Sequence, residues 1–199
     1  MTARLVAPLA VVAVLLLAAA PASAADPFVH DLALINGHLR NAIEYAPEEL
    51  DESLRSAAMV CGLGESAAGA GEAELAAADW STLGQLVERV ATRASARVEA
   101  AFGNADSVLP GLRERYERRW AGATEPLREL RRGVAEVRGG IAAVRAAVAG
   151  LATPFERWHA RECTAATRGV TAVFARLPAG LGRINVGMLR LWRLAESRR

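Results

Sequence analysis

The sequence predicts an all-α protein: a single-domain antiparallel bundle of five to seven helices over residues 25–199, preceded by an export signal. Alanine, leucine, arginine and glutamate dominate the composition, whereas threonine, isoleucine, tyrosine and phenylalanine are scarce. Apolar side chains recur at alternating steps of three and four residues, as they do on one face of an α-helix. No run of residues has the character of a strand.

Residues 1–24 have the three parts of a signal peptide. Arg4 supplies a positive charge, an uncharged apolar run extends from Leu5 to Ala20, and Ala22-Ser23-Ala24 offers the small residues that signal peptidase requires. An uncleaved anchor is the disfavoured alternative, because the run is shorter than the roughly 20 residues that cross a bilayer. We therefore expect a secreted or extracytoplasmic protein, in the cell envelope or periplasm if not outside the cell, without a transmembrane segment after cleavage.

The first two helices of the mature chain are predicted from signals at their N-termini. Asp26 is an N-cap and Pro27 fits the first helical position. The inner face of this helix is then Phe28, Leu32, Ile35, Leu39 and Ala42. Pro47 begins a second helix, whose inner stripe ends at Cys61, and residues 62–71 are a flexible Gly/Ala loop.

The sequence pattern in the middle of the chain predicts two shorter helices and one long helix. The first ends near Phe102, where Gly103-Asn104 stops it, and the second covers Leu109 to Trp120 before a turn at Gly122. A long central helix follows near 125–152. Eight of its apolar residues keep one register, which is typical of a bundle or coiled-coil seam: Leu127, Leu130, Val134, Val137, Ile141, Val144, Val148 and Leu151. Burial at the centre is favoured over a membrane-inserting hairpin.

Two further helices complete the predicted bundle. Thr153 and Pro154 begin one that continues to Phe174. The last helix is basic and amphipathic, with Arg183, Arg190 and Arg193 opposite its apolar side. These arginines are a candidate face for a membrane or an acidic partner.

Charge is divided unevenly along the chain. Residues 26–106 carry 14 acidic side chains and 5 arginines, whereas residues 107–199 carry 8 acidic side chains and 18 arginines. The favoured interpretation is that acidic N-terminal helices pack beside basic C-terminal helices and partly neutralise them. A basic face directed at an anionic membrane or an acidic partner is the alternative.

Two cysteines in an exported chain favour a disulfide, Cys61–Cys163. It would close a loop of about 100 residues, a constraint that is worth roughly 4–5 kcal/mol in the loop-entropy description. A metal or haem site that uses His159 and Cys163 is the disfavoured alternative. We expect neither a metal site nor a cofactor.

Function is only weakly constrained by the sequence. The chain lacks a Gly-x-Ser-x-Gly motif and zinc-ligand spacing, so we expect no catalytic residue and no enzymatic activity. The leading hypothesis is a secreted, non-catalytic module that binds a protein or an envelope surface, and we expect no nucleic acid partner. The alternatives are a carrier of a lipid, haem or other apolar ligand, and a membrane-active protein that uses its basic C-terminal helix. The candidate ligand-binding residues are His30, His38, Tyr45 and His159.

Overall fold

The computed structural model describes residues 26–40, 73–160 and 162–197. Within these ranges the chain is helical and contains no strand, which confirms the all-α class. The elements are a helix at 27–40, α3 (Ala73–Arg119), α4 (Thr124–Ala149), α5 (Ala152–His159), α6 (Cys163–Phe174) and α7 (Leu177–Glu196). The signal peptide, the helix after Pro47 and the 62–71 loop lie outside the described residues, so they and the number of helices in the whole chain stay predictions.

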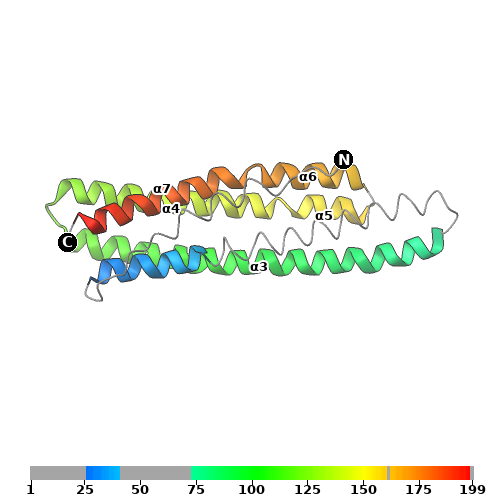
Figure 1. Cartoon of the computed structure of the whole chain (residues 1–199), viewed down its shortest axis with the longest axis horizontal. Coiled ribbons are helices and arrows are strands. Elements are labelled where there is room, and N and C mark those ends of the chain that lie inside the picture. Colours follow the sequence, from blue (N-terminus) through cyan, green and yellow to red (C-terminus); the bar gives the residue numbers. More distant parts are fainter. Residues whose placement is uncertain (1–25, 41–72, 161, 198–199) are drawn as a thin grey trace.

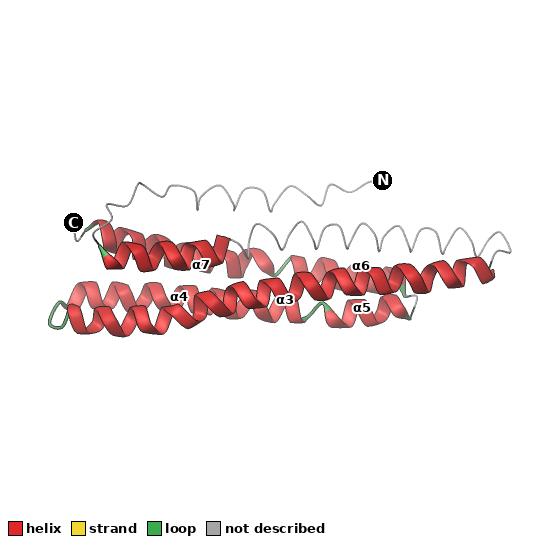
Figure 2. Cartoon of the chain, turned by 90° about the horizontal axis from the view of Figure 1, so that it is seen from below, coloured by secondary structure: helices red, strands yellow, loops and turns green. Residues whose placement is uncertain are grey.

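The described helices form an elongated antiparallel bundle, in which α3 runs along almost the whole length (Figure 1). From the end of α3 the chain turns back, and α4 and α5 follow one another along it. It turns again, and α6 and α7 return beside them. The helix at 27–40 lies against the C-terminal half of α3. Figure 2 shows the same bundle from below, with α3 again running along α4 and α5.

The helix at 27–40 starts as the sequence predicts. The Asp26 carboxylate accepts a hydrogen bond from the Phe28 amide at 3.0 Å, and the apolar face of the helix is buried. The Phe28 ring meets those of Tyr116 and Trp120 edge-on, with centroids 4.5 and 5.2 Å away. This aromatic cluster fixes the helix to the end of α3.

One long helix replaces the two that the sequence predicts before residue 120. α3 continues through Gly103, Asn104 and Pro110, so the predicted helix end at Gly103 is wrong. The reason is tertiary: an unbroken buried stripe crosses the junction, and its burial outweighs the local cost of a glycine and a proline. The stripe consists of Val98, Phe102, Ala105, Leu109, Leu112 and Tyr116. The turn after α3 is confirmed, with Gly122 in the left-handed region at φ +89°.

α4 is the central helix, in contact with both α3 and α7. It ends at Ala149, slightly before the predicted end near residue 152. Of the eight apolar positions in register, Leu127 and Val148 are half-buried and the rest are buried. The seam read from the sequence is therefore the core of the bundle.

The predicted single helix from Thr153 to Phe174 is wrong, because the chain reverses direction between α5 and α6. The amide of Glu162 donates to the Arg157 carbonyl at 2.9 Å in this turn. The hairpin brings Pro154 onto Gly169, where a Cβ would lie 2.7 Å from Pro154 Cγ. No glycine or proline marks the turn, so only the packing of α5 on α6 determines where the helix breaks.

Glycines bring α4 and α7 into backbone contact. A Cβ on Gly140 would lie 2.7 Å from the Gly180 carbonyl oxygen, and one on Gly187 would lie 2.7 Å from the Gly133 carbonyl oxygen. Both helices thus carry two glycines seven residues apart, and the pairs face each other in antiparallel register. The seven-residue spacing of these glycines is visible in the sequence, but their contact was not among the predictions above.

Candidate functional site

A row of arginines seven residues apart faces α3 from α4. Nε of Arg131 donates to Glu117 at 2.6 Å, Nε of Arg138 donates to Asp106 at 2.8 Å, and Arg145 is bound by Glu99 through two nitrogens. The partners descend along α3 as the arginines ascend along α4, as antiparallel helices require. The pairs of Arg138 and Arg145 connect the acidic part of the chain to the basic part, whereas that of Arg131 lies within the basic part.

Further ion pairs cross between the two halves of the sequence. Arg115 lies 3.1 Å from the buried Asp31, and Arg119 lies 3.9 Å from Asp26. Within the described residues, acidic side chains of the first half therefore form ion pairs with arginines of the second half. This supports the favoured interpretation, in which acidic helices dock on basic ones.

The space between α3 and α4 contains a groove of about 360 Å³ beside the arginine row. Its floor is made of small or buried residues, Val134, Ala135, Gly139, Ile141 and Ala142, and its charged lining consists of Asp106, Arg113, Arg131, Arg138 and Arg145. Together with the carboxylates that pair with these arginines (Glu117, Asp106 and Glu99), four guanidinium groups face three carboxylates, which leaves one positive charge in surplus. The sequence predicts no contact between Arg113 and the arginines of α4, because the register of α3 on α4 is a tertiary property.

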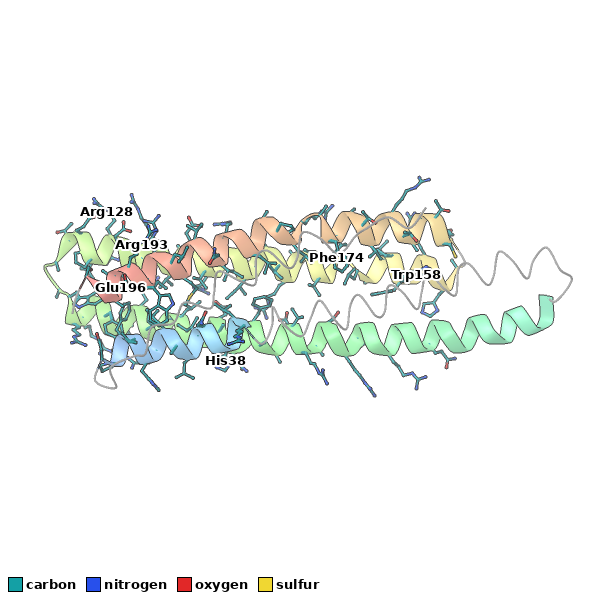
Figure 3. All side chains as sticks on the ribbon, viewed as in Figure 1. His38, Arg128, Trp158, Phe174, Arg193 and Glu196 are labelled. Atoms are coloured by element: carbon teal, nitrogen blue, oxygen red, sulfur yellow. The ribbon has the colours of Figure 1, made fainter. Side chains whose placement is uncertain are left out.

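The predicted histidine ligands are not brought together. His30 is exposed and His38 half-buried on the helix at 27–40, whereas His159 ends α5, where its Nε2 lies 3.3 Å from Glu88. Figure 3 shows His38 and Trp158, the neighbour of His159, at separate positions along the bundle. Tyr45 lies outside the described residues. Within the described ranges no group of three or more potential metal ligands is found.

The apolar side of α7 belongs to the core. Leu181, Ile184 and Met188 are buried. On its polar side Arg183 pairs with Glu136 at 3.2 Å and Arg190 with Glu129 at 2.5 Å, whereas Arg193 is exposed toward the C-terminal end of α7 (Figure 3). Two of the three arginines proposed for a partner are thus bound within the molecule. No helix in the described ranges combines the length and apolarity needed to span a membrane.

Cys163 is the first residue of α6 and packs, half-buried, against the core. No free cysteine thiol is found among the described residues. Cys61 lies outside them, so its pairing with Cys163 stays a prediction.

Comparison with known protein families, curated proteins and solved structures finds no significant match to the chain.

Tyr116 makes stability sensitive to alkaline pH. Burial, with a smaller contribution from the Asp31 carboxylate, raises the pKa of this phenol from 10.0 to about 12. Because the folded state holds the proton more tightly than the unfolded chain, the stabilisation is complete below pH 10 and lost as pH rises to 12. We expect a loss of about 1–2 kcal/mol in that window, absent in Tyr116→Phe. Urea unfolding at pH 9 and pH 11 measures the loss of stability. An equal loss in Tyr116→Phe would show that Tyr116 is not its cause.

The Arg190–Glu129 pair makes stability sensitive to acid. The hydrogen bond from Arg190 lowers the pKa of Glu129 below 4.5, so this stabilisation is present above pH 4.5 and lost as pH falls through the folded pKa. We expect Arg190→Gln to remove about 1 kcal/mol of stability at pH 7 but much less at pH 3. Arg193→Gln is the control for the charge change. The same loss at both pH values would show that Arg190 acts through packing alone.

Proposed function

We propose that the mature protein is an exported, non-catalytic interaction module that binds another protein or an envelope surface through the outer face of α7. The observation that carries this proposal is the exposure of two apolar side chains one turn apart, Val186 at 49% and Leu189 at 41%. Exposed Arg193 lies one turn beyond Leu189 on the same side of the helix. An apolar pair beside an arginine is suited to a partner surface that offers apolar contact and negative charge.

The architecture supports a binding role because it holds this face rigidly. The α4–α7 backbone contact leaves little freedom for α7 to shift on its neighbour. The ion pairs of Arg183 and Arg190 with α4 add charge-assisted contacts on the flank of the same helix. A rigid surface loses less conformational entropy when it binds than a mobile one does.

Export and the disulfide are parts of the same proposal. Cleavage after Ala24 would deliver the chain to an oxidising compartment, where Cys61 and Cys163 would pair. The absence of a free thiol among the described residues supports that pairing. Thiol counting before and after reduction tests it. Two titratable thiols in the unreduced exported protein would contradict the disulfide. An N-terminus other than Ala25 would contradict cleavage after Ala24.

The binding face is tested with two matched sets of variants. Protein purified from its own host is crosslinked to its partner, and the crosslinked mass is compared between wild type and the Val186→Gln/Leu189→Gln double variant. Leu34→Gln is the control, since Leu34 is as exposed, at 43%, but lies on the helix at 27–40. We expect the crosslink to be lost only in the double variant. Its persistence there would overturn the proposed face.

The membrane-active alternative makes a different prediction in the same variants. With the apolar side of α7 buried, that activity would require α7 to leave the bundle or to act through Val186, Leu189 and Arg193 alone. Anionic vesicles that bind the wild type but not the double variant, with no protein crosslink, would favour a membrane surface as the partner.

A further inference from the structure

The α3–α4 groove contains arginines whose hydrogen-bonding capacity is only partly used. Arg131 and Arg138 each bond their carboxylate through Nε, and within the described residues their terminal nitrogens have no other partner. A guanidinium group has five N–H donors, so four remain on each of these side chains. Arg145 differs, because Glu99 binds it through both Nε and a terminal nitrogen.

Positive charge is in excess of negative charge at one end of this groove. Glu117 is shared by Arg131, at 2.6 Å, and Arg113, at 3.8 Å, so one carboxylate faces two guanidinium groups. The distance to Arg113 exceeds that of a hydrogen bond. Arg113 lies on α3 and Arg131 on α4, so the two cations approach the groove from opposite walls.

The groove has the size and floor of a small-molecule site. Its volume, about 360 Å³, is within the range of ligand pockets. Ala135 and Ala142 contribute only methyl groups to its lining, which keeps the space between the arginines open. Pairs of N–H donors on a planar guanidinium match the oxygens of a phosphate or carboxylate group.

From these features we infer that the groove binds a small ligand with at least two anionic groups, phosphate or carboxylate. Arg113 and Arg131 hold one group at the end where charge is in surplus, and Arg138 holds the second. Arg131 and Arg138 are two helical turns apart, about 10 Å along α4, so a ligand with a single anionic group engages only one of them well. This site is separate from the α7 face of the proposed function.

Titration calorimetry of the mature full-length protein at low salt tests the inference, with tripolyphosphate and citrate as the two probes. We expect one probe to bind, and the choice identifies phosphate or carboxylate as the preferred group. Arg113→Gln should weaken it about tenfold, as expected for the loss of one charge-assisted contact. The Arg131→Gln/Arg138→Gln double variant should abolish binding.

Arg118→Gln is the matched control. Arg118 is also on α3 and also pairs with a glutamate one turn away, at 3.7 Å, but it does not line the groove. We expect its affinity to equal that of the wild type. Equal weakening in Arg113→Gln and Arg118→Gln would show attraction by net charge alone and overturn the site, as would the absence of binding by either probe. Circular dichroism of each variant confirms that the fold is kept. A negative result leaves the crosslinking test on α7 unaffected, because the variants share no residue.

Discussion

Gly140→Ala is expected to lower the thermal unfolding midpoint by about 4–8 °C. The added methyl group would lie 2.6 Å from Ile184 Cγ1 and 2.7 Å from both the Gly180 carbonyl oxygen and the Ile184 amide nitrogen. Two of these atoms are backbone, so α4 and α7 must separate to accommodate it. We take the cost as about 3 kcal/mol, which exceeds the gain of about 1 kcal/mol from replacing a helical glycine and leaves about 2 kcal/mol of net destabilisation.

Gly182→Ala provides the control, with the opposite expected sign. Gly182 lies on α7, two residues from Gly180, but a Cβ there would meet nothing within 4 Å. This substitution should therefore raise the midpoint slightly, through helix propensity alone. A midpoint for Gly140→Ala that equals or exceeds that of Gly182→Ala would show that the helices are not in backbone contact.

Removal of residues 180–199 is expected to unfold the protein, and not merely to delete a binding element. The segment buries five large apolar side chains: Leu181, Ile184, Met188, Leu191 and Leu194. At about 1.5–3 kcal/mol each, their burial amounts to about 8–15 kcal/mol, which is as large as the whole stability of a typical domain. We expect the truncated chain to lose its cooperative thermal transition by circular dichroism.

The control for this truncation is Arg193→Gln, which removes an exposed charge of the same segment and should leave the transition unchanged. A truncated chain that still melted cooperatively near the wild-type midpoint would mean that α7 is peripheral. The expected outcome also bears on function. Loss of membrane or partner binding after truncation would not identify α7 as the binding element, so point variants at Val186 and Leu189 are needed.

Local signals in the sequence were sufficient for several elements. The helix class, the capped start at Asp26, the turn at Gly122 and the central helix that became α4 follow from periodicity and from end signals that act over a few residues. The errors are also informative. Gly103 and Pro110 are local stop signals, yet α3 passes through both because its buried stripe is continuous.

The candidate groove could be predicted only in part. The seven-residue spacing of Arg131, Arg138 and Arg145 is visible in the sequence and places them on one side of a helix. The position of Arg113 opposite them depends on which turn of α3 packs against which turn of α4. The local sequence of either helix does not contain that information. The same holds for the shared carboxylate of Glu117.

By itself, then, the sequence determined that the chain is helical, where most of its apolar faces lie and that its two halves carry opposite charge. Only the tertiary structure decided where those helices continue or break, and how they pair. The physical reason is range: caps, propensities and periodicity act within one or two turns, whereas the α5–α6 reversal and the glycine contacts of α4 with α7 arise from packing between distant segments.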